Sequence, residues 1–248
     1  MFLPTRFFLL ALGALVSVAL RAATPASPSY DGMVLPFREA VVSAPVQSTL
    51  VEVAVKEGDI VKVGQPLARL YSRMEELDMA RAKAALEKRA SDDAHAQSLF
   101  AEKIIPEDKA LEARIEHDLA RLQYDMAVEQ VRLRTITAPL DGLVVEKIHE
   151  AGEAVSPAVP LLRIVDISRV YVQFYIRVEE LDKFRVGQTL ASRFPLLNNG
   201  QAFTGTVDFI DPRVDAASGL LRVKVLVENP ARLIKAGMRA EVAPPAAP

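Results

Sequence analysis

A segment of 27 residues occurs twice in the chain, and its two copies are 94 positions apart. Residues 44–70 and 138–164 align without a gap, and nine of the 27 positions are identical, among them Gly58 and Gly152. So many identities indicate an internal repeat. The 67 residues between the copies, 71–137, therefore interrupt a module that is written in two halves.

Each half of the repeat has the pattern of short strands joined by tight turns. Val51, Val53 and Val55 occupy alternate positions, which is the period of a strand with one buried face. Glycines follow at positions where a chain reversal needs positive φ or a close backbone approach. The glycines that we expect at structural turns are Gly58, Gly64, Gly142, Gly152 and Gly237.

The sequence between the halves predicts two helices. Residues 72–102 contain eight alanines and neither glycine nor proline, and residues 107–134 have a similar composition. Pro106, followed by two acidic residues, suits the first turn of the second helix. Helices of 31 and 28 residues would form an antiparallel hairpin about 40–45 Å long.

Apolar residues of the second helix recur at intervals of 4, 3, 4 and 7 positions, interrupted only at Glu129. This spacing is typical of a coiled-coil seam. The first helix has a weaker stripe of alanines, which permits close approach of a partner. The stripe that we expect to hold the hairpin consists of Ile115, Leu119, Leu122, Met126 and Leu133.

The C-terminal third of the chain returns to strand patterns. Residues 166–243 contain several alternating segments, and turn signals at 198–200 and 228–230 separate some of them. Residues 30–43 predict one or two strands broken at Pro36. Together these segments predict a small antiparallel β-barrel.

The two ends of the chain differ from the rest. Residues 1–22 have a basic residue, an apolar core of 14 residues and a small-residue cleavage site, which indicates a signal peptide. An uncleaved membrane anchor is the alternative, although 14 apolar residues are few for a span that needs roughly 20. The proline- and alanine-rich residues 244–248 predict a disordered tail.

The composition argues against several functions. A net charge of −2 gives no basic excess, so nothing indicates binding to nucleic acid. The absence of cysteine excludes disulfides, thiolate metal sites and a cysteine nucleophile. His95, His117 and His149 are scattered without the spacing of metal ligands, and the methionines of the two helices are expected to pack in the core. We expect no catalytic, metal or cofactor site.

Three segments resemble the membrane fusion protein (HlyD-like) family, the periplasmic adaptors of bacterial efflux systems. Residues 55–70 resemble the first half of the family's lipoyl-like, or barrel-sandwich hybrid, domain. Residues 136–155 resemble the second half and include the A-P-x-D-G signature at 138–142. Residues 205–242 resemble the barrel of adaptors that serve RND pumps.

The resemblance implies a mainly β fold with an inserted α-helical hairpin. The split lipoyl-like domain would comprise residues 44–70 and 138–165, with the hairpin at 71–137. The small antiparallel β-barrel would comprise residues 30–43 and 166–243.

The resemblance also implies an adaptor function without enzyme activity or a cofactor. Adaptors of this family form rings, commonly hexameric, and link an inner-membrane transporter to an outer-membrane channel from the periplasm. The chain ends soon after the predicted barrel, so the barrel itself is expected to face the pump. Two alternatives remain open, namely a self-assembling periplasmic coiled-coil scaffold without a pump and the adaptor of an ABC-type exporter.

The expected hairpin tip departs from the family pattern. Many RND-type adaptors carry Arg-x3-Leu-x6-Ser there, and aligning Leu99 with the leucine places His95 at the arginine and Pro106 at the serine. Only the leucine is retained. The residues that we expect to contact the outer-membrane channel are His95, Leu99, Ile104 and Ile105. Alternatively, His95 and Leu99 only pack the end of the hairpin.

Overall fold

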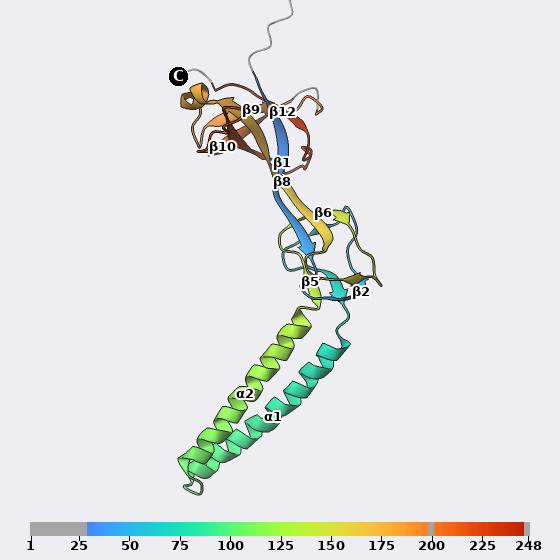
Figure 1. Cartoon of the computed structure of the whole chain (residues 1–248), viewed down its shortest axis with the longest axis vertical. Coiled ribbons are helices and arrows are strands. Elements are labelled where there is room, and N and C mark those ends of the chain that lie inside the picture. Colours follow the sequence, from blue (N-terminus) through green and yellow to red (C-terminus); the bar gives the residue numbers. More distant parts are fainter. Residues whose placement is uncertain (1–28, 198–200, 246–248) are drawn as a thin grey trace, which may run out of the picture.

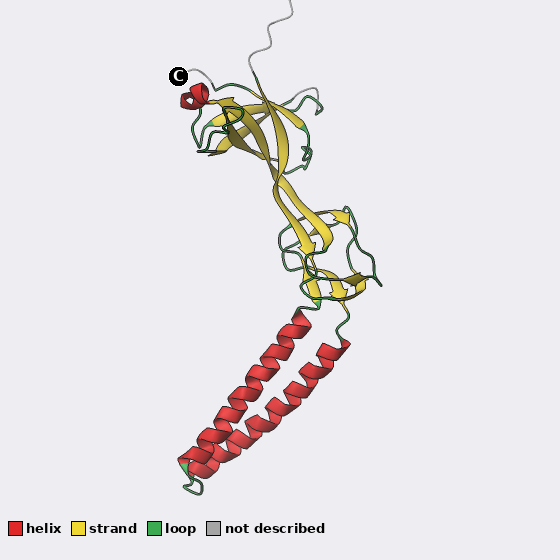
Figure 2. Ribbon diagram, in the orientation of Figure 1, coloured by secondary structure: helices red, strands yellow, loops and turns green. Residues whose placement is uncertain are grey.

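A computed structural model describes residues 29–197 and 201–245, which form an elongated molecule of three parts (Figure 1). A β-barrel lies at one end, a smaller β domain in the middle and a helical hairpin at the other end (Figure 2). The predicted class, mainly β with an inserted hairpin, is confirmed. The predicted signal peptide and residues 246–248 of the predicted tail lie outside the described residues. In the described part, no helix is long and apolar enough to span a bilayer.

The elements follow one another in a simple order. The N-terminal strands are β1 Tyr30–Ser43, β2 Ser48–Val53, β3 Ile60–Val61 and β4 Pro66–Leu70. The hairpin consists of α1 Arg73–Ala101 and α2 Glu107–Arg132, and β5 Thr135–Thr137, β6 Gly142–Lys147 and β7 Ala154–Val155 follow it. The last elements are β8 Pro160–Arg177, the short 3-10 helix η1 Val178–Lys183, β9 Thr189–Arg193, β10 Ala202–Ile210, β11 Leu220–Glu228 and β12 Arg239–Val242.

The barrel is a closed antiparallel sheet. Its strand order is β1-β12-β9-β10-β11-β8, and the pairing of β1 with β8 closes it. Alternate residues point inward, as the period of a strand requires. The buried inward residues of β8 and β11 are Val170, Val172, Phe174, Ile176, Leu221, Val223, Val225 and Val227. The barrel therefore has its own apolar core.

The two repeat halves build the middle domain by exchanging equivalent hydrogen bonds. The N–H of Gly58 donates to the carbonyl of Val144 at 2.9 Å, and the N–H of Gly152 donates to the carbonyl of Leu50 at 2.7 Å. Donors and acceptors in these two bonds are each separated by the repeat offset of 94. In the same way β2 pairs with β7 and β3 pairs with β6. Each half is thus completed by the other.

Two of the identities in the repeat form matching ion pairs. Arg69 lies 3.3 Å from Glu52, and the equivalent Arg163 lies 2.9 Å from Glu146. Each pair joins neighbouring strands of its own half. Because the four side chains are exposed, each pair contributes only about 0–1 kcal/mol, and their main effect is on strand register.

The predicted turn glycines meet two different requirements. Gly142 begins β6, where an added Cβ would lie 2.6 Å from the carbonyl oxygen of Val165. That strand approaches β8 so closely that only glycine fits. Positive φ is found at Gly58, Gly64, Gly152 and Gly237.

The connection between the barrel and the middle domain consists of β1 and β8, which run through both parts. We call this connection the waist, residues 36–38 of β1 and 166–170 of β8. Of the one or two strands predicted around Pro36, the structure has one, β1, with 14 residues, and its pairing with β8 is irregular between Pro36 and Arg38. Pairing with β12 ends at Met33, so Pro36 lies where one strand edge is free, a position at which strands tolerate proline.

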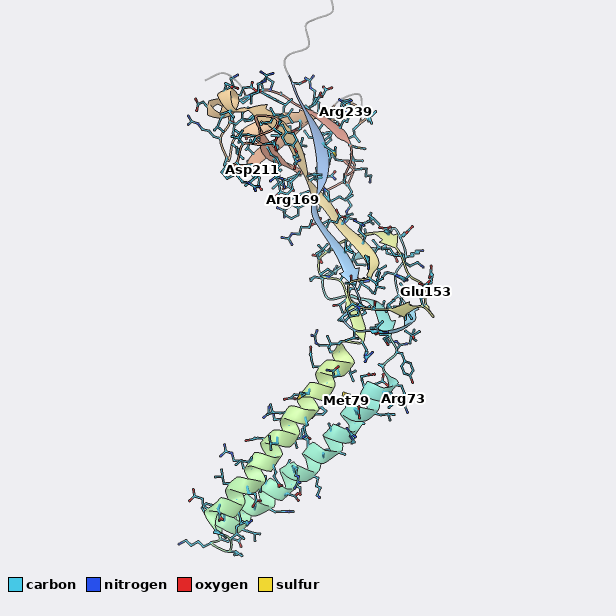
Figure 3. All side chains as sticks on the ribbon, in the orientation of Figure 1. Arg73, Met79, Glu153, Arg169, Asp211 and Arg239 are labelled. Atoms are coloured by element: carbon cyan, nitrogen blue, oxygen red, sulfur yellow. The ribbon has the colours of Figure 1, made fainter. Side chains whose placement is uncertain are left out.

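The waist is irregular but well packed. Pro36 pairs with Val170 and Arg38 pairs with Asp166, so three residues of β8 face the single residue Phe37. Arg169 lies at the waist, and its guanidinium carbon is 3.8 Å from the centroid of the Phe37 ring (Figure 3). Because both cores share β1 and β8, the domain boundaries named above remain a proposal.

Asn229, in the loop after β11, anchors the barrel to the waist. Its side chain is buried and donates to the carbonyls of Ile167 and Ile234 at 2.8 and 2.9 Å. Its amide oxygen accepts the N–H of Ile234 at 3.1 Å, and its own N–H donates to the carbonyl of Ser168 at 2.9 Å. One side chain therefore satisfies several buried backbone groups.

We expect Asn229→Ala to lower the free energy of unfolding by about 2–4 kcal/mol, because buried backbone groups lose their partners. Asn229→Asp should also destabilise the protein, since an ionised carboxylate cannot donate to the two carbonyls. Urea denaturation followed by circular dichroism measures both effects. The exposed neighbour provides a control, and Glu228→Gln should change stability by less than about 0.5 kcal/mol. If Asn229→Ala left the free energy of unfolding unchanged, the hydrogen bonds of Asn229 would be dispensable for stability.

A second prediction concerns the turn at Gly64, whose repeat equivalent is Ala158. Both residues have positive φ, 80° and 71°, and this conformation is unfavourable for a residue with a Cβ. Ala158→Gly should therefore raise the free energy of unfolding by about 0.5–1 kcal/mol, whereas Gly64→Ala should lower it by a similar amount. Urea denaturation of the two variants provides the measurement. Effects of the same sign would contradict this account.

Candidate functional site

The hairpin is the part of the molecule that projects farthest from the β domains (Figure 1). α1 and α2 contain 29 and 26 residues, which corresponds to a length of about 40 Å. Pro106 caps the N-terminus of α2 with an extended backbone, φ −75° and ψ 158°, instead of lying in its first turn. The hairpin offers two kinds of surface, its sides and its tip.

The helices pack on each other through small and polar side chains. Residues of α2 with restricted exposure recur every three or four positions and include Ala110, Ala113, His117, Ala120, Tyr124, Ala127 and Val131. Arg89 lies 2.6 Å from Glu116, and Asp93 lies 3.5 Å from His117. Small residues allow close approach of the backbones, and these cross-helix polar pairs fix the register.

Most of the stripe predicted to hold the hairpin is exposed, and Met126 also lines the groove between the helices. Ile115, Leu119, Leu122 and Met126 are between 50% and 68% exposed, and Leu133, just after α2, is half-buried. The prediction is therefore wrong for Ile115, Leu119 and Leu122, and for Met126 it stays a prediction. Heptad spacing identifies one apolar face of a helix, but here α1 packs against the opposite, alanine-rich face.

Two acids of α2, Glu112 and Glu129, are paired with cations of the same helix. Hydrogen bonds from Arg132, at 2.7 Å to one carboxylate oxygen, hold the pKa of Glu129 below its usual value. Lys109 lowers the pKa of Glu112 in the same way through a 2.7 Å hydrogen bond. The stripe is consequently an exposed apolar surface without unpaired acids at these positions, a feature typical of interaction sites.

The tip is shaped by the way in which α1 ends. The N–H of Ile104 donates to the carbonyl of Leu99 and the N–H of Lys103 donates to the carbonyl of Phe100, both at 2.8 Å. Lys103 has a φ of 60°. These bonds form a Schellman motif, in which the residues equivalent to Leu99 and Ile104 commonly touch.

The tip brings together most of the residues that the sequence indicated. Leu99 and Ile104 are exposed and lie in the same turn, His95 is exposed one turn earlier and Ile105 is half-buried. Phe100 is also exposed and was not predicted. The motif usually has glycine where Lys103 stands, so no glycine marked the turn in the sequence.

No group of three or more His, Asp or Glu side chains in residues 29–197 and 201–245 could hold a metal ion. His117 pairs with Asp93 inside the hairpin, and His149 pairs with Glu153 on the surface of the middle domain.

Comparison with known families matches both β parts of the chain. The family described as "CzcB-like, barrel-sandwich hybrid domain" matches residues 38–166, a little over half of the chain, and "CusB-like, beta-barrel domain" matches residues 169–247. A barrel-sandwich domain split by a hairpin and followed by this barrel defines an efflux adaptor. The chain belongs to the membrane fusion protein family, whose members are periplasmic adaptors of efflux systems.

Curated relatives and solved structures agree with this assignment. Nodulation protein NolF of Rhizobium meliloti is 25% identical over 240 residues, covering 90% of this chain and 64% of its own length. Nickel-cobalt-cadmium resistance protein NccB of Alcaligenes xylosoxydans xylosoxydans is 26% identical, covering 84% and 61%. The chain spans between half and two thirds of the length of such relatives.

Two solved structures share the fold. A MacA-MexA chimera that contains the Pseudomonas aeruginosa MexA α-hairpin domain has a TM-score of 0.77 and 22% identity, covering 87% of this chain and 77% of the chimera. The membrane fusion protein Spr0693 from Streptococcus pneumoniae R6 has a TM-score of 0.72 and 19% identity, covering 90% and 100%. At these identities the likeness concerns the fold.

The outward orientation of the stripe leads to a prediction for neighbouring residues of α2. Leu119→Gln should change the free energy of hairpin opening by less than about 0.5 kcal/mol in the monomer, since Leu119 already contacts water. Ala120→Gln should lower it by about 1–3 kcal/mol, because a larger side chain cannot fit against α1. Hydrogen exchange of hairpin amides in dilute protein measures both values. A larger effect at Leu119 would place the stripe inside the hairpin.

Proposed function

We propose that this protein is the adaptor subunit of a tripartite efflux complex in the periplasm. In this proposal, residues 1–22 direct export, and a ring of copies links an inner-membrane transporter of the RND type to an outer-membrane channel. The observation that carries the proposal is the outward apolar stripe on a long hairpin, attached to the family's barrel-sandwich domain. No catalytic step is required of the chain.

The sides of the hairpin support assembly of copies into a ring. Five large apolar side chains of α2 face outward along about four turns, namely Leu111, Ile115, Leu119, Leu122 and Met126. A groove between the helices is lined by Ala82, Ala85, Ala127 and Met126, and charged and polar residues, namely Glu75, Asp78, Arg81, Gln123 and Gln130, complete its lining. Large side chains of one copy can pack against the apolar part of this groove in the next copy. Such head-to-tail contacts generate a ring when the rotation closes.

The tip supports contact with the outer-membrane channel. Leu99, Phe100 and Ile104 provide exposed apolar side chains at the end of the molecule that lies opposite the barrel (Figure 1). The Schellman turn fixes the backbone that carries them. We propose that this apolar tip, with His95 beside it, replaces the arginine- and serine-containing tip of other adaptors.

Relatives that share this architecture carry names for different cargo. One is cobalt-zinc-cadmium resistance protein CzcB of Cupriavidus metallidurans, and another is antibiotic efflux pump periplasmic linker protein ArpA of Pseudomonas putida. We therefore infer that the region shared by these relatives links the parts of an efflux system and does not recognise one particular cargo. The same linking function is the part of the activity that we propose for this chain.

Photocrosslinking in living cells from three positions tests the proposal. A probe at Leu99 should link to an outer-membrane channel, a probe at Leu119 to a second copy, and a probe at Leu196 on the barrel to an inner-membrane transporter. Mass spectrometry of the adducts identifies each partner and distinguishes an RND pump from an ABC exporter. Each position controls for the others, because the hairpin tip and the barrel lie at opposite ends.

Two outcomes would contradict the proposal. Self-adducts alone at all three positions, at matched expression, would favour the self-assembling scaffold. A channel adduct from Leu196 with none from Leu99 would reverse the proposed orientation.

A further inference from the structure

A cleft of about 340 Å³ lies where the barrel meets the middle domain. Its floor includes Ile60 of β3, Leu143 of β6 and Val165 of β8, which are in register across three adjacent strands. Ile60 is 59% exposed, and the other two side chains are half-buried. Single exposed apolar side chains are common on protein surfaces, but a row of them inside a cleft is typical of a binding site.

Two cations from different domains line the same cleft. Lys62 follows β3 in the middle domain, and Arg232 belongs to the barrel loop that Asn229 anchors. Within residues 29–197 and 201–245, neither side chain has a hydrogen bond or an ion pair. Both therefore have donors available for an additional partner.

The backbone at Arg232 has an unfavourable conformation that local hydrogen bonds hold in place. Its φ is 53°, a conformation uncommon for a residue other than glycine. Its N–H donates to the carbonyl of Asn229 at 2.9 Å, and its carbonyl accepts a 2.7 Å hydrogen bond from Lys235. Strained backbone that is fixed by its surroundings often occurs at ligand sites.

The acidic residues of the cleft already accept hydrogen bonds from the protein. Asp141 accepts the N–H of Val63 at 2.7 Å. Asp166 accepts the N–H and the hydroxyl of Ser168 at 2.9 and 2.7 Å. Each acid keeps its second carboxylate oxygen, Oδ2, without a hydrogen bond, whereas the two cations are the charged lining side chains of the described residues that donate no hydrogen bond. A ligand that matches these free donors must supply acceptor oxygens beside an apolar part.

We propose that this cleft binds a small amphipathic anion. Its apolar chain lies on Ile60, Leu143 and Val165, and its carboxylate or phosphate group lies with Lys62 and Arg232. The cleft volume falls at the lower end of the roughly 300–1,000 Å³ typical of small-molecule sites, which suits a single short-chain molecule. Because the two cations belong to different domains, the bound anion links the barrel to the middle domain. This site is independent of the partner surfaces on the hairpin.

Calorimetric titration of the purified protein tests the site directly. Decanoate and decyl phosphate, both below their micelle-forming concentrations, serve as probes for the two headgroups. We expect saturable binding of one molecule per chain, and the tighter probe identifies the headgroup. Lys62→Gln and Arg232→Gly should each weaken binding about tenfold, as expected for loss of a charge-assisted hydrogen bond. Glycine keeps the left-handed backbone at position 232 available.

Matched controls separate this site from unspecific binding. Lys56→Gln removes an exposed lysine of the same domain that does not line the cleft, and it should leave the affinity unchanged. Inorganic phosphate and decyltrimethylammonium, which each lack one half of the required chemistry, should bind at least tenfold more weakly than the better probe. Absence of binding by both anionic probes would overturn the proposal. Binding that is unaffected by both cleft substitutions, or equal binding of either control ligand, would also overturn it.

Discussion

The structure depends on the reciprocal pairing of two repeat halves that are far apart in sequence. Gly58 bonds to the half that contains Val144, and Gly152 bonds to the half that contains Leu50. Neither half can satisfy these backbone groups alone, so the chain must bring together residues that are 86 and 102 positions apart. The ends of the hairpin are held side by side as a result. A long helical pair with few buried side chains can then project from a fixed base.

The sequence predicted this pairing well because the same physical requirement is present twice. Gly58 and Gly152 mark equivalent turns, and the matching Glu and Arg residues mark equivalent strand pairs. The hairpin stripe was harder to interpret. Ile115 and Leu119 identify an apolar face, but spacing within one helix does not show which neighbour covers it. The alanines on the opposite face of α2 bury little area, but they allow the closest approach of α1. α1 therefore packs against the alanine face of α2.

Turns without glycine are the features that sequence patterns could not indicate. Lys103, Ala158 and Arg232 have positive φ in the described residues, although none of them is glycine. Each lies in a turn closed by backbone hydrogen bonds, and these bonds outweigh the unfavourable conformation of one residue. Because no glycine marks the turn at the hairpin tip, the sequence did not predict this turn. For the same reason it did not predict that Phe100 and Leu99 lie together there. The position of Arg232 at the cleft was hidden for the same reason.

The repeat also has a mechanical consequence. The hairpin leaves the middle domain after Leu70, and the barrel strand continues beyond Ile164, which is the equivalent position in the second half. In the same way β1 enters the first half from the barrel, and α2 returns to the second half from the hairpin. Each half therefore connects the two ends of the molecule. A pull between hairpin and barrel is carried by two parallel lengths of chain, which the reciprocal hydrogen bonds tie to each other.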